Sequence, residues 1–168
     1  MIGILTRPVP YSLACLVARA AVGPFATKLA RSQIDLAERP FEGNPFTRDP
    51  ARYGIARALY RTWAELRLGE PTWAWVRFAC DIEHHLAASG AAERIECPVT
   101  IVAAGQEKLV DNAASARFAA RLRHGNFILV DGAYHELLME ENRYRAQFWQ
   151  AFDTVTASPG QTGSVSSA

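Results

Sequence analysis

Residues 97–112 read CPVTIVAAGQEKLVDN, and residues 126–136 read NFILVDGAYHE. Val99–Ala104 is a short apolar run rich in β-branched residues, as expected of a parallel strand covered on both faces. Phe127–Val130 has the same character, and Asn112–Leu122 between the two runs has the pattern of a helix. These two stretches therefore predict two parallel strands joined by a helical crossover, which is α/β architecture.

Each of these strands is followed by a residue that can do chemistry. Glu107 follows the first strand, and His135 follows the second. Functional groups of parallel sheets gather beyond the carboxyl ends of the strands, so we expect the two side chains to lie close together. An acid and a histidine in this order form two thirds of a Ser–His–acid triad, in which the acid orients the imidazole and stabilises its cation. Histidine, which titrates near neutral pH, suits the role of general base.

Two carboxylates are candidates for the acid. Glu107 lies directly beyond the strand, whereas Asp111 occupies the expected N-cap of the following helix. We expect Glu107 to be the acid and keep Asp111 as the alternative. For His135 the alternative to a catalytic role is a cap on the closing helix, which is expected to span 135–154. The small residues Gly132-Ala133 favour the catalytic role, because they let the loop bend over the strand end.

The third member of such a triad has no counterpart in the sequence. No Gly-x-Ser-x-Gly motif, the turn that presents a nucleophilic serine, occurs in the 168 residues. The chain therefore carries an acid and a base but no nucleophile of this kind.

Upstream of residue 90 the pattern is helical. Apolar spacing predicts a helix over Tyr11–Val22, ended by Gly23-Pro24. Asp49-Pro50 is a strong helix start, because Asp caps free N–H groups and Pro suits the first helical position. That helix is expected to end near Leu68, and another is expected over Pro71–Ala88. The predicted organisation is a strand end and turn at 1–10, a helical lid at 11–90, a strand–helix–strand–helix unit at 91–155 and a disordered tail at 156–168.

Composition narrows the class of protein. Apolar residues make up 49%, charged residues 21%, and the net charge is +1, as in an ordinary single globular domain with no nucleic-acid partner. No run approaches the ~20 apolar residues of a membrane span. The three cysteines, Cys15, Cys80 and Cys97, are odd in number and widely spaced, so we expect small buried thiols in a cytoplasmic protein rather than a disulfide framework.

Other kinds of site find little support. The HELLM stretch at 135–139 begins like a zinc-protease helix, but Met139 replaces the second histidine, so no metal site is expected. His84 and His85 are adjacent and point about 100° apart on a helix, which suits solvated side chains. Trp73 and Trp75 are candidates for lining an acyl-chain pocket. Trp63 and Phe78 are further candidates for lining such a pocket, and the alternative for all four side chains is packing between lid helices.

The chain resembles the C-terminal part of the α/β-hydrolase fold, in the lysophospholipase and monoacylglycerol lipase-like branch often described as serine aminopeptidase-like hydrolases. The likeness spans roughly residues 1–154. It is carried by CPV at 97–99, AGQEKLVDN at 104–112 and GAYHE at 132–136, and by lid-like NPFTRD at 44–49 and GEPTW at 69–73.

This resemblance implies a carboxylic-ester hydrolase acting on a lipid-like or small ester, with His135 as base, Glu107 as acid and no cofactor. It places the start of the chain past the nucleophile elbow, so the chain should hold two to three strands of the parallel sheet and be inactive alone. It allows at most peripheral contact with a membrane, such as the inner membrane. The alternative is a non-catalytic binding or assembly module, associating with itself or a companion chain through an exposed sheet edge.

Overall fold

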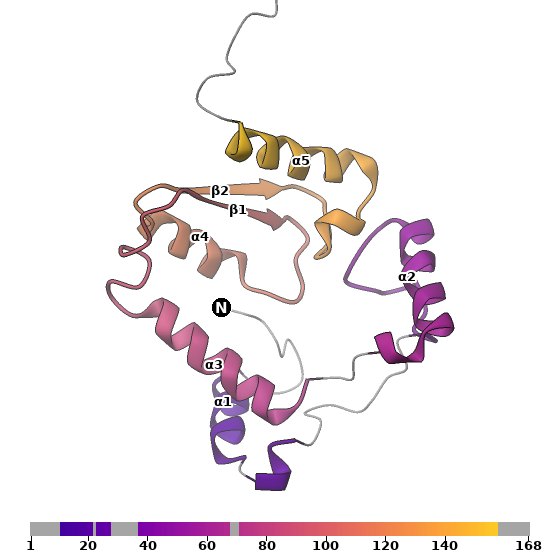
Figure 1. Ribbon diagram of the computed structural model, residues 1–168, viewed down its shortest axis with the longest axis horizontal. Helices are drawn as coiled ribbons and strands as arrows, with labels where there is room; N and C mark the ends of the chain where they lie inside the picture. Colours follow the sequence, from indigo (N-terminus) through magenta and orange to yellow (C-terminus); the bar gives the residue numbers. More distant parts are fainter. Residues whose placement is uncertain (1–10, 22, 28–36, 68–70, 158–168) are drawn as a thin grey trace, which may run out of the picture.

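The computed structural model describes residues 11–21, 23–27, 37–67 and 71–157 (Figure 1). The expected strand end and turn at 1–10, the expected helix end near Leu68 and the tail beyond 157 lie outside these residues. In chain order the elements are α1 (Tyr11–Ala20), the 3-10 turn η1 (Gly23–Phe25), α2 (Pro50–Thr62), η2 (Ala64–Leu66), α3 (Trp73–Ala87), β1 (Val99–Ala104), α4 (Asn112–Arg121), β2 (Gly125–Val130), η3 (Leu137–Met139) and α5 (Asn142–Thr156).

The predicted crossover unit is confirmed. β1 and β2 are parallel, in a register that pairs Val99 with Gly125 and Ala104 with Val130. Helix α4 joins them and covers one face of this sheet, while α5 covers the other (Figure 1). The core between the sheet and α5 is built on Val130, Leu137 and Tyr144. β2 is less buried than expected, because Leu129 is 51% exposed.

The two strand ends approach each other closely at glycines. A side chain at Gly105 would come within 2.8 Å of the Asp131 Cα, and the Gly105 N–H donates to the Val130 carbonyl. Gly132 has a φ of 78°, and a side chain there would come within 2.8 Å of the Tyr144 hydroxyl. Only glycine accepts both constraints at low cost, so these positions bring the segments after β1 and β2 together.

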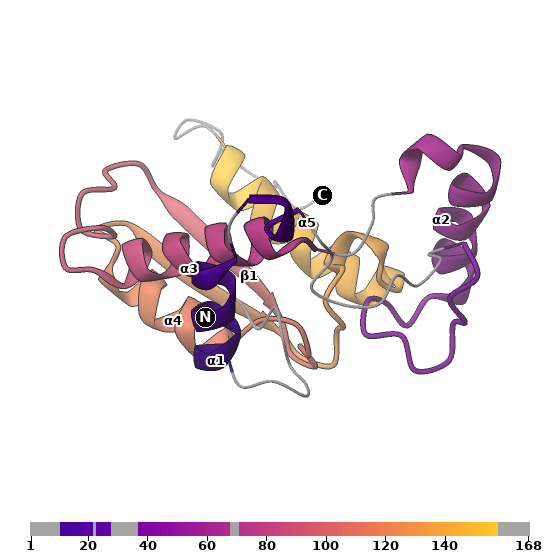
Figure 2. The same cartoon turned by 90° about the horizontal axis from the view of Figure 1, so that it is seen from below.

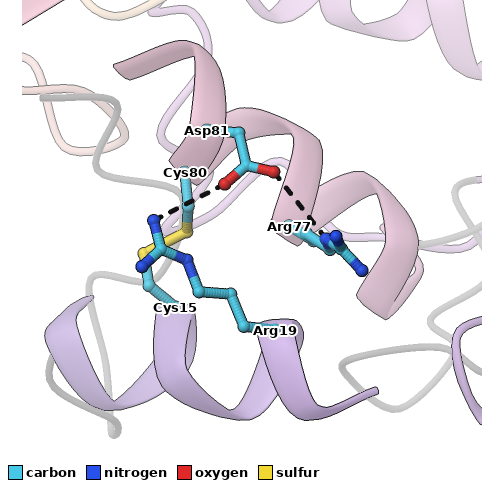
Figure 3. Close-up of a disulfide and its surroundings, with 5 residues drawn as sticks. All are labelled: Cys15, Arg19, Arg77, Cys80 and Asp81. Atoms are coloured by element: carbon cyan, nitrogen blue, oxygen red, sulfur yellow. Dashed lines mark ion pairs between the residues drawn. A yellow bond between two sulfur atoms is a disulfide. The ribbon is translucent and has the colours of Figure 1, made fainter. Parts of the chain in front are cut away.

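Helices α1 and α3 lie side by side and are joined by a disulfide between Cys15 and Cys80 (Figure 3). The expectation of free thiols is wrong for this pair, since the two helices bring the Cα atoms to 5.9 Å. Cys97 is a free cysteine, but it is exposed rather than a core residue, because it precedes β1 in an open turn.

Two charged contacts flank the disulfide. Asp81 of α3 pairs with Arg19 of α1 at 3.5 Å and with Arg77 of its own helix at 3.7 Å (Figure 3). All three side chains are about half exposed, so each pair contributes little to stability.

The remaining differences from the sequence expectations lie at helix ends. Asp49 caps α2 as predicted, with its carboxylate accepting from the Ala51 and Arg52 N–H groups. However, α2 ends at Thr62 rather than near Leu68, because Trp63 adopts an extended backbone. Helix α3 begins at Trp73, where the Thr72 hydroxyl accepts from the Trp75 N–H. Helix α2 lies at the opposite end of the molecule from α4 (Figure 2).

The closing helix differs most. It was expected from His135, but α5 begins at Asn142, after the turn η3. The cause is Glu140, whose side chain turns inward and binds the backbone of the loop instead of lying on a helix surface. Within the described residues, no helix combines the length and apolar character needed to cross a membrane.

Candidate active site

The Glu107 and His135 side chains meet at the carboxyl ends of the two strands. Glu107 Oε2 lies 2.7 Å from His135 Nδ1. The other oxygen, Oε1, accepts from three consecutive backbone N–H groups, those of Lys108, Leu109 and Val110. Both carboxylate oxygens are therefore engaged, which fixes the plane of the group that faces the imidazole.

The exposure of the two side chains differs in a way that suits their chemistry. Glu107 is only 5% exposed, whereas His135 is 30% exposed. An ionised carboxylate only accepts, so the contact places the proton on His135 Nδ1 and leaves Nε2 as the basic nitrogen. Among the described residues, Nε2 has no hydrogen-bond partner. The arrangement presents an oriented imidazole that is partly exposed to solvent.

The alternative acid is occupied elsewhere. Asp111 Oδ1 accepts from the N–H groups of Ala113 and Ala114 at the start of α4, and Oδ2 lies 3.8 Å from Arg117. This confirms Asp111 as the N-cap of α4. The structure thus brings Glu107, and not Asp111, into contact with His135.

A second buried carboxylate holds the loop that carries the histidine. Glu140 is fully buried and accepts backbone N–H groups from Tyr134 at 2.6 Å and from Arg48 and Glu141 at 3.1 Å. Its contact with Tyr134 lies one residue before His135. Sequence reasoning missed Glu140, because beside Glu141 it looks like part of a solvated acidic pair on a helix.

The segment before α2 is fastened to the same loop. The Thr47 hydroxyl donates to the Met139 carbonyl at 2.7 Å, and Arg48 Nε donates to the Gly132 carbonyl at 2.8 Å. The backbone N–H groups of His135 and Glu136 donate to the carbonyls of Pro45 and Phe46.

Asn44 shapes this segment. Its side chain accepts from the N–H groups of Phe46 and Thr47, and it donates to the Thr47 carbonyl. The Phe46 ring consequently stands edge-on to the His135 imidazole, with centroids 6.5 Å apart. Residues far apart in sequence thus form one hydrogen-bonded unit around the base.

The aromatic candidates Trp73 and Trp75 lie in the first turn of α3. Trp73 stacks on Phe25 and packs against the cluster around the disulfide, and Trp75 is 47% exposed. Among the described residues, the His135 ring pairs with Phe46 and with neither of these two tryptophans. His84 and His85 are exposed, and the described part of the chain holds no group of three His, Cys, Asp or Glu side chains suited to a metal ion.

The chain is similar to a protein family, to curated relatives and to solved structures, and the three kinds of match agree with one another. The model of the family described as serine aminopeptidase, S33 matches residues 12–142. Lysophospholipase L2 of Escherichia coli strain K12 is 28% identical over 114 residues, which cover 64% of this chain and 33% of the relative. A second Escherichia coli strain, O6:H1, has a lysophospholipase L2 that matches to the same extent.

Two solved structures share the fold at 16% identity. A soluble variant of monoglyceride lipase from Saccharomyces cerevisiae, in complex with a substrate analog, has a TM-score of 0.60 and matches 86% of this chain and 47% of its own. Monoacylglycerol lipase of Paleococcus ferrophilus has a TM-score of 0.58 and matches 91% and 55%. The chain spans about a third of the curated relatives and about half of these structures.

Proposed function

Because the chain belongs to the serine aminopeptidase S33 family, in the lysophospholipase and monoglyceride lipase-like branch of the α/β-hydrolases, we propose that it serves hydrolysis of carboxylic esters of lipid-like substrates. The observation that carries the proposal is the 2.7 Å contact between Glu107 Oε2 and His135 Nδ1, with Nε2 left accessible. The names of the relatives supply the substrate class, and the contact supplies the chemistry.

In the proposed mechanism, His135 Nε2 removes the proton of a serine hydroxyl as that oxygen attacks the ester carbonyl. Glu107 stabilises the imidazolium that forms. The proton then passes from Nε2 to the leaving alcohol. In the second half of the reaction Nε2 takes a proton from water as the water attacks the acyl-serine, and it returns that proton to the serine oxygen as the acid is released. The serine must come from a Gly-x-Ser-x-Gly segment, which these 168 residues do not contain, and that segment also supplies one of the backbone N–H groups that stabilise the oxyanion.

This division of roles predicts that the 168-residue chain does not react with a fluorophosphonate probe. Covalent labelling of the purified chain would overturn it. When a Gly-x-Ser-x-Gly segment encoded directly upstream in frame is expressed with the chain, release of fatty acid from a lysophospholipid or monoglyceride is expected. His135→Gln should reduce that rate by about a thousandfold or more. An unchanged rate would contradict the assignment of the base.

A second candidate is an assembly module, and one observation favours it. Leu129 of β2 and the α5 side chains Trp149 and Phe152 are each 43–51% exposed, which is unusual beside a sheet core. Association with a companion chain or a second copy would cover exposed apolar side chains of this kind. Sedimentation that shows a monodisperse monomer at high concentration would count against it.

The disulfide bears on the cellular compartment of the protein. The sequence favoured a cytoplasmic location with at most peripheral contact with a membrane, but disulfides persist mainly in oxidising compartments. The Cys15–Cys80 bond therefore argues for an oxidising location. Trapping the thiols by alkylation in intact cells distinguishes the two, since a cytoplasmic protein would have both cysteines alkylated.

A further inference from the structure

The hydrogen bond between Glu107 and His135 joins two turns that are held by separate contacts. Glu107 is fixed within its own turn, because Oε1 accepts from the three backbone N–H groups of residues 108–110. The imidazole is carried by the turn at 132–135, which follows β2. A hydrogen bond weakens steeply when its length or its angle changes. The 2.7 Å contact therefore depends on what fixes the second turn.

The backbone of the turn at 132–135 needs outside contacts to hold one position. Gly132 has a φ of 78° and no side chain, so this residue adds adaptability rather than stiffness. On the side of β1, the Gln106 N–H donates to the Ala133 carbonyl at 2.8 Å. The Gly132 carbonyl accepts from Arg48 Nε, also at 2.8 Å. The turn is thus held between the segment that follows β1 and the segment that precedes α2.

Arg48 binds this turn both directly and through Glu140. Besides the bond to Gly132, its Cζ lies 4.5 Å from the centroid of the Tyr134 ring. Its backbone N–H donates to Glu140 Oε2, while Glu140 Oε1 accepts from the Tyr134 N–H. These contacts close a ring that runs from Arg48 through the turn and Glu140 back to Arg48. Neither end of the turn can move away from Arg48 without breaking a hydrogen bond.

The segment that carries Arg48 also shapes the space beside the base. A cavity of about 380 Å³ lies between α2, the segment before it and the turn after His135. Phe46 and Thr47, the two residues before Arg48, line this cavity, and so does Glu136. The Phe46 ring stands edge-on to the His135 imidazole. The position of the Arg48 segment is therefore linked both to the base and to the cavity.

We propose that Arg48 is a positioning residue for His135, an inference that rests on the proposed ester hydrolysis. The guanidinium holds the turn at Gly132, and this keeps His135 Nδ1 within hydrogen-bond reach of Glu107. Arg48 acts through the turn and not on the reacting atoms. The base is oriented only while the segment before α2 is bound to the turn.

The test is proton NMR of the 168-residue chain, in which the Hδ1 proton of His135 reports the contact with Glu107. Arg48→Met keeps the length of the side chain but removes its donors. The Hδ1 proton should then exchange with water at least about fivefold faster than in the wild type, because a hydrogen bond that holds the turn is lost. Arg48→Lys keeps the charge and one donor group, so its rate should lie between the two.

The matched control is Arg121→Met. Arg121 lies on α4 and, like Arg48, donates to backbone carbonyls of a distant segment, those of Leu86, Ala87 and Ala88. This variant should lose stability but leave the exchange rate of the Hδ1 proton unchanged. A merely structural role of Arg48 would make the two variants alike.

Equal exchange rates in the wild type and Arg48→Met would overturn the proposal, as would equal acceleration in Arg121→Met. Should Arg48→Met fail to fold, the comparison of Arg48→Lys with Arg121→Lys decides in the same way. The assay needs no nucleophile, so it fails separately from the proposed hydrolysis.

A second readout uses the chain expressed with an upstream Gly-x-Ser-x-Gly segment. In Arg48→Met, kcat should fall about fivefold or more at unchanged KM, because the proposed role concerns the base and not substrate binding. A rise in KM at unchanged kcat would contradict that role. If no form of the protein releases fatty acid while Arg48→Met still accelerates Hδ1 exchange, the proposed hydrolysis fails and the positioning of His135 by Arg48 stands.

Discussion

The surroundings of His135 and the paired helices α1 and α3 are held together by different means. Around His135, two buried carboxylates, Glu107 and Glu140, bind six backbone N–H groups between them. Between α1 and α3, the contacts are a disulfide, a small apolar cluster and one half-exposed ion pair, between Arg19 and Asp81. The first arrangement fixes the direction of each side chain and backbone group, as the proposed proton transfer requires, whereas the second only keeps two helices close to each other.

The largest expected effect comes from removing Glu140. Glu140→Ala leaves the N–H groups of Tyr134, Arg48 and Glu141 without their acceptor, which should lower the free energy of unfolding by about 4 kcal/mol. Urea denaturation measures this. The matched control is Glu141→Ala, which removes a surface carboxylate paired with Arg143 and should cost at most about 0.5 kcal/mol. Similar losses in the two variants would show that the buried carboxylate has no special role.

Breaking the disulfide is expected to act on the other region alone. For the 65-residue separation of Cys15 and Cys80, closing the loop in the unfolded chain corresponds to about 4 kcal/mol of stability. The loss on breaking the bond is smaller to the extent that the other contacts between α1 and α3 still hold the two helices together. With a dithiol reductant, or in Cys15→Ser, the amides of α1 should exchange with solvent about a hundredfold faster or more.

Amides of β1 should keep their protection, and Cys97→Ser, which alters the free cysteine, should leave both regions unchanged. Equal loss of protection in β1 and α1 would contradict the separation of the two regions.

A smaller effect is expected at the N-cap of α4. Asp111→Ala removes the acceptor for the N–H groups of Ala113 and Ala114 and should cost about 1 kcal/mol, measured by thermal denaturation. Because Asp111 does not contact His135, the resonances of the imidazole should stay in place. A clear shift of the His135 imidazole resonances in Asp111→Ala would restore Asp111 as a candidate acid.

The smallest effect concerns pH. The Arg121 guanidinium, which donates to both carboxylate oxygens of Glu93, lowers the pKa of Glu93 from 4.5 to about 2. A lowered pKa means that the pair stabilises the fold fully above pH 4.5 and loses this contribution as the pH falls towards 2. The difference in the free energy of unfolding between the wild type and Glu93→Gln should therefore be constant near neutral pH. It should become smaller as the pH falls below 4.5. A difference that grows with acid would reverse the sign and contradict the pairing.

The sequence predicted the parts of the fold that depend on local chemistry. The bounds of β1, the caps Asp49 and Asp111, and the placement of Glu107 and His135 beyond the strands all follow from neighbouring residues. What it missed depends on distant partners.

The bond between Cys15 and Cys80 joins residues that carry no local signal for each other. Likewise, Glu140 delays the start of α5 because Arg48 and Tyr134, one of them far away in sequence, offer it N–H groups. The cavity beside Phe46 exists only once α2 and the turn after His135 meet.

The central claim is that Glu107 orients His135, and the imidazole Hδ1 proton reports on this directly. A proton held between Nδ1 and a buried carboxylate resonates far downfield in NMR spectra. We predict such a signal in the wild type, its persistence in Asp111→Asn, and a marked upfield shift or loss in Glu107→Gln. A downfield signal that survives Glu107→Gln, or disappears in Asp111→Asn, would contradict the account.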